Sequence, residues 1–93
     1  MRARELRNQR LNLGDGRSVR IVIWEVPEPK KPSAHSYKYR LAFIVNDVCV
    51  LRYDNELGKG DHRHEGRHQT PYIFSTLDKL IDDFMNEIEN WRA

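Results

Sequence analysis

The stretch HSYKYRLAFIVNDVCVLRY, residues 35–53, decides the fold. Its first part has a period of two, because aromatic and apolar residues occupy every second position: Tyr37, Tyr39, Leu41, Phe43 and Val45. Asn46-Asp47 is a short turn signal between this run and the apolar residues 48–53. The stretch therefore predicts two antiparallel strands joined by a tight hairpin.

A further strand is predicted upstream, over residues 18–26. It follows the turn signal Gly14-Asp15-Gly16. Val19, Ile21 and Ile23 occupy alternate positions in it, which gives the strand one apolar face and one mixed face. We expect the apolar face to pack on a helix.

The segments on either side of this strand are expected to be irregular. Three prolines in residues 27–33 remove backbone donors and exclude a central strand, so this segment is predicted to be a loop. Residues 1–10 are rich in arginine and offer only Leu6 as an apolar side chain for docking. We therefore expect a frayed basic arm or a short helix there.

The C-terminal part of the chain predicts one amphipathic helix over residues 75–92. Ser75 is a natural N-cap, and one stripe is apolar at helical spacing: Leu77, Leu80, Ile81, Phe84, Ile88 and Trp91. Residues 71–74 are a candidate for a short strand before the helix. The expected fold class is α+β, an antiparallel meander sheet of about four strands packed against one amphipathic C-terminal helix. Residues 18–54 would form the meander, and residues 1–93 a single domain.

Composition supports one small globular domain, since 93 residues with 39% hydrophobic and 32% charged side chains can bury only one core. The net charge of +2 is too small for the dense positive field of a dedicated duplex binder. No run is apolar over the roughly 20 residues that span a bilayer, and Met1 to Arg10 carry charges where a secretory leader is apolar. We expect a cytoplasmic protein without membrane contact, in which the single cysteine, Cys49, is a small buried hydrophobe.

Polar chemistry is concentrated in DNELGKGDHRHEGRH, residues 54–68. Residues 55–70 are predicted to be a polar loop rich in glycine and histidine. If the chain is extended around the histidines, His62 and His64 point to one side with Cα atoms roughly 6.5 Å apart, and the residues that alternate with them point to the other side. The spacing therefore predicts a convergent pair of imidazoles.

The imidazole pair suits metal-free cleavage of RNA, in which one histidine takes a proton from a 2′-hydroxyl and a second group donates one to the leaving 5′-oxygen. Lys59, Arg63 or Arg67 would stabilise the charge that develops on the phosphoryl oxygens. Gly58 and Gly60 would let backbone amides approach a phosphate closely. This chemistry needs no cofactor.

Two other interpretations of the segment stay open. Two imidazoles with Asp61 or Asp54 would make a three-ligand site for zinc or another divalent ion, as in a metal-dependent hydrolase. Alternatively, the histidines and arginines of a solvated loop would pair with nearby carboxylates, and the chain would be a non-enzymatic module that binds protein or nucleic acid. His35, alone at the start of a strand, is expected to be structural.

The second half of the chain contains a distinctive pattern, made of Tyr53-Asp54-Asn55, Gly58-Lys59-Gly60-Asp61-His62-Arg63-His64, Pro71-Tyr72-Ile73-Phe74, and Leu80 with Asp83-Phe84 in the helix. This pattern resembles the TumE-type toxins of bacterial and archaeal toxin–antitoxin modules. The resemblance implies a small toxin that acts on RNA and is encoded beside a helix-turn-helix antitoxin that neutralises it. It also adds Asp54 and Asn55 to the candidate site, because the family's motif falls on both.

We therefore expect the toxin of a toxin–antitoxin module, acting as a metal-independent ribonuclease. Its predicted catalytic residues are His62, His64, Asp61, Arg63 and Lys59. Its predicted substrate-binding residues are Arg67, Asp54, Asn55, Gly58 and Gly60. The expected partners are a helix-turn-helix antitoxin, an RNA substrate and a second copy of the chain in a homodimer.

Overall fold

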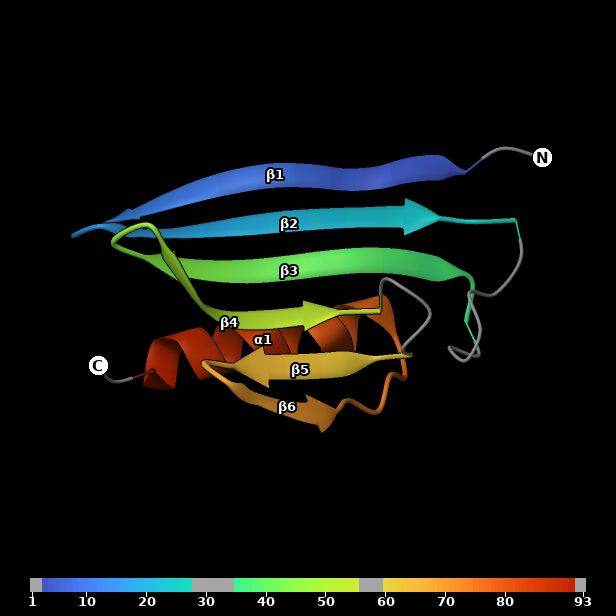
Figure 1. Cartoon of the computed structure of the whole chain (residues 1–93). Coiled ribbons are helices and arrows are strands. Elements are labelled where there is room, and N and C mark those ends of the chain that lie inside the picture. Colours follow the sequence, from blue (N-terminus) through green and yellow to red (C-terminus); the bar gives the residue numbers. More distant parts are fainter. Residues whose placement is uncertain (1–2, 28–34, 56–59, 92–93) are drawn as a thin grey trace.

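The computed structural model describes residues 3–27, 35–55 and 60–91, and it shows six strands followed by one helix (Figure 1). The elements are β1 (Arg4–Gly14), β2 (Arg17–Glu25), β3 (Tyr37–Val45), β4 (Val48–Asp54), β5 (His62–Glu65), β6 (His68–Pro71) and α1 (Leu77–Asn90). The strands form one sheet in chain order, each antiparallel to the next. The predicted α+β meander with one C-terminal helix is confirmed, but the sheet has six strands and not about four.

The N-terminal segment is a strand and not the predicted arm or short helix, because residues 4–10 belong to β1. β1 is an edge strand whose side chains are mostly exposed. Its pairing with β2 is reinforced by hydrogen bonds from Arg4 to Glu25 at 2.8 Å and from Arg20 to Asn8 at 2.7 Å. Backbone hydrogen bonds to a neighbour can hold such a strand without an apolar alternation in its own sequence. The missing alternation is why the sequence did not predict it.

The predicted polar loop over residues 55–70 is largely a hairpin, formed by β5 and β6 at the end of the sheet. Gly66 lies in its turn with a φ of +58°, a backbone conformation that favours glycine. All four residues of β6 are exposed, so this edge strand also forms through backbone pairing and not through burial. The short strand expected over residues 71–74 is wrong beyond Pro71, where β6 ends.

The helix is capped one residue later than expected. The hydroxyl of Thr76, and not that of Ser75, accepts a hydrogen bond from the backbone N–H of Lys79 at 3.1 Å. The helix then runs over Leu77–Asn90 and not from residue 75. It buries three side chains of the predicted apolar stripe against the sheet: Leu80, Phe84 and Ile88.

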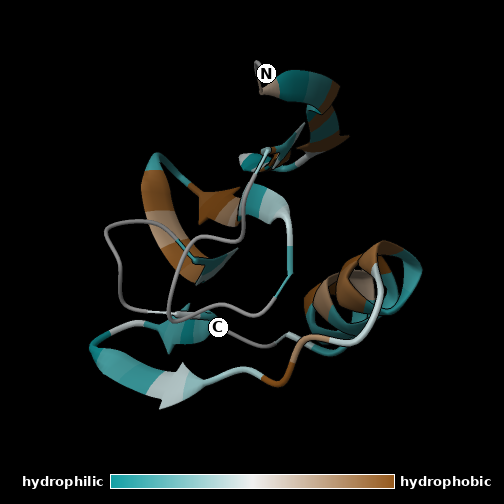
Figure 2. Cartoon of the chain, turned by 90° about the vertical axis from the view of Figure 1, so that its right-hand side faces the viewer, coloured by the Kyte–Doolittle hydropathy of each residue, from teal (hydrophilic) through white to brown (hydrophobic). Residues whose placement is uncertain are grey.

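The core lies between α1 and one face of the sheet, and Figure 2 shows the helix on that side. The sheet supplies buried side chains from three strands: Val19, Ile21, Ile23, Tyr39, Leu41, Phe43, Leu51 and Tyr53. Cys49 is exposed and not buried as predicted, because it lies near the β3–β4 turn on a side of the sheet that α1 does not cover. No helix within the described ranges is long and apolar enough to cross a membrane.

Candidate active site

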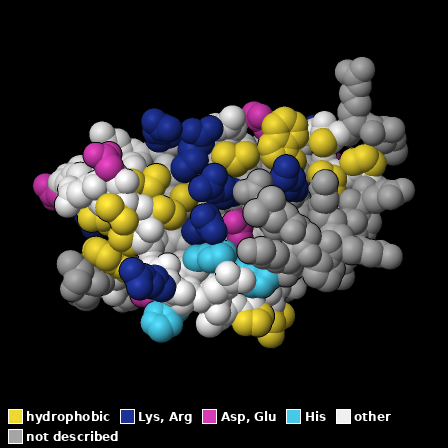
Figure 3. Space-filling view, in the orientation of Figure 1, with side chains coloured by type: hydrophobic (Ala, Val, Ile, Leu, Met, Phe, Trp, Pro, Cys, Tyr) yellow, Lys and Arg dark blue, Asp and Glu magenta, His cyan; other side chains and the backbone are white. Residues whose placement is uncertain are grey.

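The sheet face opposite α1, hereafter the open face, carries the two histidines of the predicted pair. Cross-strand partners in antiparallel strands point to the same face. β4 and β5 pair Arg52 with His64, and Asp54 with His62. The β4 residues that alternate with Arg52 and Asp54 are buried in the core on the other face. The open face therefore brings these four polar side chains together, and Figure 3 shows histidine beside lysine and arginine there.

The two imidazoles lie side by side on this face. Their ring centroids are 6.3 Å apart, with the ring planes tilted by 38°. Both His62 and His64 are partly exposed. Proton transfer works through hydrogen bonds of about 2.6–3.2 Å, and two rings at this spacing can reach different atoms of one bound group. The predicted convergence of the two histidines is confirmed.

A backbone carbonyl sets the tautomer of His62. Its Nδ1 lies 2.9 Å from the carbonyl oxygen of Gly60, and since a carbonyl oxygen only accepts, Nδ1 donates the hydrogen bond. Nε2 of His62 is then left to accept a proton when the ring is neutral and to donate one when it is charged. Gly60 has a φ of +77°, which favours glycine. The backbone carbonyl of Gly60 therefore contributes to the site, and the contact of its amide with a phosphate stays a prediction.

Arg52 and Asp54 flank His64. Nε2 of His64 lies 3.4 Å from Oδ1 of Asp54, and Oδ2 of the same carboxylate lies 3.1 Å from Nε of Arg52. Burial and the positive charge of Arg52 lower the pKa of His64 below its usual value of 6.5, and they outweigh the opposite effect of Asp54. His64 is therefore mostly neutral at pH 7, with Asp54 placed to orient its ring.

Arg63 faces α1, away from the imidazoles. It donates from Nε to Oε1 of Glu87 at 2.6 Å and from Nη2 to Oε2 at 2.8 Å. Nη2 also donates to Glu65 at 2.8 Å, and Glu87 accepts from the hydroxyl of Tyr53 at 2.6 Å. The hydrogen bonds to Glu87 raise the pKa of Arg63, which keeps its charge. Arg63 therefore ties β5 to the helix, and the structure does not bring it to the histidine pair as predicted.

Asp61 belongs to a cluster that contacts the core at the end of the sheet. Its Oδ1 accepts from the hydroxyl of Tyr39 at 2.9 Å and lies 2.8 Å from Nε2 of His35. Because Nδ1 of His35 accepts a backbone N–H, Nε2 is the nitrogen that donates to Asp61. The ring of His35 stacks on Phe74 with centroids 3.8 Å apart. Asp61 therefore anchors the chain beside His62, and His35 has the structural role expected of it.

Asn55 is also committed to structure. It is 2% exposed, and its Oδ1 accepts from the backbone N–H of Tyr39 at 3.0 Å. Its Nδ2 donates to the carbonyl of Tyr37 at 2.7 Å. These contacts join the end of β4 to β3, so the Asn55 side chain is buried and bonded within the sheet.

The remaining predicted site residues lie away from the pair or outside the described ranges. Arg67 is exposed in the β5–β6 turn, at the opposite end of β5 from His62. Lys59 and Gly58 lie outside the described residues. Within the described ranges, no three His, Cys, Asp or Glu side chains gather closely enough to hold a metal ion. The three-ligand site considered from the sequence is therefore not assembled in that part of the chain.

Sequence reasoning missed the cations that surround the histidine pair. Arg52 lies beside His64 and lines a shallow hollow of about 100 Å³ with Cys49, Leu51, His64 and Gly66. Arg40 is the cross-strand partner of Asp54 on β3. Both arginines alternate with core residues, so the period of two already assigned them to the same face. That signal was available in the sequence.

The fold and this site define a class: a small α+β protein whose sheet has one open face with a histidine pair among cations. Comparison with protein-family models matches residues 3–92 to the family described as Toxin TumE. The chain belongs to the TumE toxin family, which confirms the resemblance, and it is the toxin of a toxin–antitoxin module with an antitoxin as its partner. Searches of curated proteins and of solved structures return no significant match.

Proposed function

We propose that this toxin is a metal-independent endoribonuclease that cleaves RNA at the histidine pair. The observation that supports this most is the pair itself, two partly exposed imidazoles with centroids 6.3 Å apart on one face of β5. Histidine can both accept and donate a proton near pH 7. Arg52, next to His64, supplies a positive charge where a phosphate would lie.

His64 is the proposed general base, because its lowered pKa keeps it neutral and Asp54 orients its ring. It takes the proton of the 2′-hydroxyl, the 2′-oxygen bonds to the adjacent phosphorus, and the bond from phosphorus to the 5′-oxygen breaks. His62 gives the proton on its Nε2 to that 5′-oxygen, which leaves as a hydroxyl. The products are a 2′,3′-cyclic phosphate and a 5′-hydroxyl. Arg52 stabilises the charge on the phosphoryl oxygens during the step.

Cleavage of RNA by the purified toxin in the presence of EDTA tests this proposal. Replacing His62→Ala or His64→Ala should lower the cleavage rate by about 10²–10⁴-fold, the usual contribution of a general acid or base. His68→Ala is a matched control, because His68 is exposed at the start of β6. Undiminished cleavage by both histidine variants would refute the proposal, and so would activity that EDTA abolishes and a divalent ion restores.

The same proposal includes a helix-turn-helix antitoxin, a homodimer and a cytoplasmic location. The family resemblance supports the type of antitoxin, and RNA as a substrate supports the cytoplasm. The exposed edge strand β1 supports a homodimer, since an edge offers unpaired backbone groups to a second copy. Growth rescue by co-expression of the neighbouring gene product would test the antitoxin. The mass of the purified toxin in solution would test the dimer.

A further inference from the structure

We propose that the open face binds single-stranded RNA, with one base stacked on Trp24 and the adjoining phosphates on Lys38 and Arg40. This inference rests on the proposed function for its RNA substrate. It adds a binding site on β2 and β3, outside the point of cleavage on β5.

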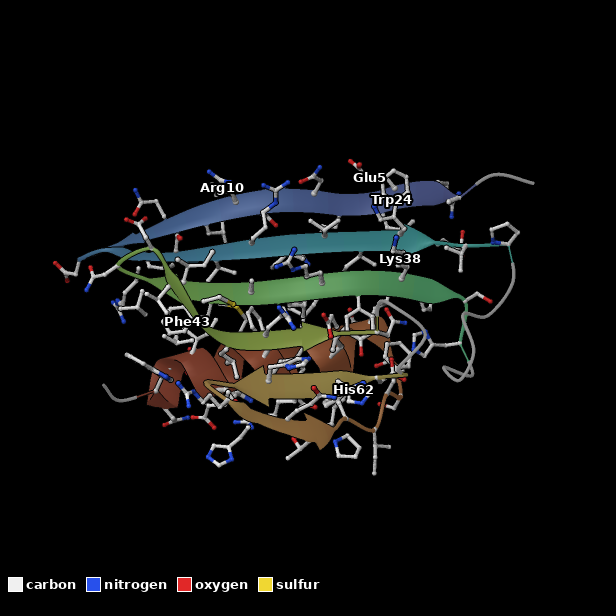
Figure 4. The ribbon with its side chains drawn as sticks, viewed as in Figure 1. Glu5, Arg10, Trp24, Lys38, Phe43 and His62 are labelled. Carbon is white, nitrogen blue, oxygen red and sulfur yellow. The ribbon has the colours of Figure 1, made fainter. Side chains whose placement is uncertain are left out.

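The register of the sheet connects this site to the histidine pair. β2 and β3 pair Trp24 with Lys38, and Val22 with Arg40. Arg40 pairs in turn with Asp54, the partner of His62. Because neighbouring strands are about 4.8 Å apart, Arg40 lies roughly 10 Å from His62 across the sheet. Figure 4 shows Trp24 and Lys38 next to each other on the same sheet that carries His62.

Trp24 is placed as a stacking platform. It is partly exposed, and it makes no ring contact with another aromatic side chain in the described part of the chain. It lines a shallow hollow of about 70 Å³ with Val22, Lys38, Tyr39 and Arg40. An indole beside cations on an exposed sheet face offers what an unpaired base needs, an apolar plane for the ring and positive charge for the backbone.

The charge of the open face is complementary to RNA. The strand register places five cations on it: Arg10, Arg20, Lys38, Arg40 and Arg52. Two carboxylates share the face, Asp54 and, at the sheet edge, Glu5 opposite Trp24. Arg40 is exposed and has no ion pair with any described residue. Several acidic residues lie instead on the helix behind the sheet: Asp78, Asp82, Asp83, Glu87 and Glu89. The net charge of +2 thus combines a basic open face with a helix in which five carboxylates outnumber one lysine.

Base stacking on Trp24 requires an unpaired strand. In a duplex the bases stack on one another, and the deep, narrow major groove of A-form RNA does not admit a side chain to them. The open face should therefore prefer single-stranded RNA to the same sequence in a duplex.

Binding of a fluorescein-labelled 2′-O-methyl RNA, which has no nucleophilic 2′-hydroxyl, tests this inference without cleavage. Fluorescence anisotropy should show that Trp24→Ala raises the Kd for the single strand at least about fivefold, the lower end of base–aromatic stacking. Trp24→Phe should recover most of the affinity. Arg40→Ala should reduce the slope of log affinity against log salt by about 0.7, the value for one phosphate contact on a single strand. Lys79→Ala, a cation on α1, is the control and should change neither quantity.

Intrinsic fluorescence gives a second readout. The chain has two tryptophans, so Trp91→Phe leaves Trp24 as the only one. Single-stranded RNA should then quench the remaining fluorescence, as stacking on an indole does.

The outcomes separate this inference from the proposed function. Unchanged binding by Trp24→Ala overturns the inference, even if the histidine variants still abolish cleavage. Equal affinity for single-stranded and duplex RNA also overturns the inference. So does a Trp24→Ala variant that binds RNA normally but no longer binds the antitoxin. Binding that depends on Trp24, in a protein that never cleaves RNA, supports the inference and refutes the ribonuclease.

Discussion

The two faces of the sheet are built from the same strands but obey different constraints. On the helix-covered face, the buried alternate residues in the middle of β2, β3 and β4 are apolar, and they form the core with Leu80, Phe84 and Ile88 of α1. On the open face, the alternate residues include arginines, a lysine, a tryptophan and two histidines. Because burial excludes unpaired charge from the first face, Arg63 and Glu87 are paired there, and most charged groups of these strands lie on the second face. The difference shows how a chain of this size can keep packing and chemistry apart.

Two adjacent residues of β5 make the contrast sharpest. Arg63 forms a bidentate hydrogen bond with Glu87 and holds the strand to the helix. His64, the next residue, lies on the open face beside Asp54 and Arg52. Two consecutive residues therefore have different roles: Arg63 belongs to a structural ion pair, and His64 is a candidate catalytic group.

The largest effect is expected from the core. Phe84 is 0% exposed on α1, so Phe84→Ala should lower the free energy of unfolding by about 3–5 kcal/mol. His64→Ala should change it by less than about 1 kcal/mol, because a partly exposed group away from the core contributes little to packing. Urea denaturation measures both. Equal losses in the two variants would show that the two faces are not independent.

A change at Asp61 should affect both stability and cleavage, because Asp61 bonds the core residue Tyr39 and directly precedes His62. Asp61→Ala leaves the donors of Tyr39 and His35 without their acceptor, which should cost about 1–3 kcal/mol in unfolding free energy. It should also lower kcat, because Asp61 anchors the backbone that places His62. Asp61→Asn keeps an acceptor oxygen and should restore much of both. If Asp61→Ala were as unstable as expected but kept its full kcat, Asp61 would not position His62.

The Arg63–Glu87 pair should affect stability without affecting chemistry. A double-mutant cycle with Arg63→Met and Glu87→Gln should give a coupling energy of about 1 kcal/mol, since both side chains are partly open to solvent. Cleavage by these variants should fall no further than their fraction unfolded. A large loss of kcat in folded Arg63→Met protein would instead place Arg63 in the catalytic machinery.

The smallest expected effect is a shift along the pH axis. The folded state lowers the pKa of His64 below 6.5, so the base stays neutral above that value, and cleavage should fall only as the pH drops further. The contribution of His64 to the free energy of unfolding has the same pH dependence as the cleavage rate. It is present above pH 6.5 and is lost as the pH falls through the lowered pKa of His64. Arg52→Gln removes one cause of the shift and should move the acid limb of single-turnover cleavage to higher pH. An unmoved limb would show that His64 is not the base.

Much of the helix-covered face and the central part of the site could be predicted from the sequence. The alternation in residues 35–53 and the spacing of the apolar stripe in α1 define which side chains are buried. The same period of two placed His62 and His64 together, and it also placed Arg63 opposite them. The prediction that Arg63 stabilises charge on the phosphate therefore conflicted with the alternation of side chains around the two histidines.

The edges of the sheet could not be predicted in this way. β1, β5 and β6 pair with neighbouring strands through backbone hydrogen bonds, and most of their side chains are polar, so they lack the apolar alternation on which the prediction relied. The hydrogen bonds of Asn55 and Asp61 were missed for a related reason. Their partners, Tyr39 and His35, lie 16 or more positions away in the chain, so nothing local indicated that these polar groups were already satisfied.

By itself, then, the amino-acid order determined the alternation along each strand and the apolar stripe of the helix, because both patterns repeat over a few residues of backbone geometry. The chain's folding determined which strands became neighbours, and with them the grouping of Trp24, Arg40 and Arg52 with the histidines on one face. Such groupings depend on pairing between strands that are distant in the sequence. The energy of this pairing is spread over many backbone contacts, so no single residue indicates which strands will pair.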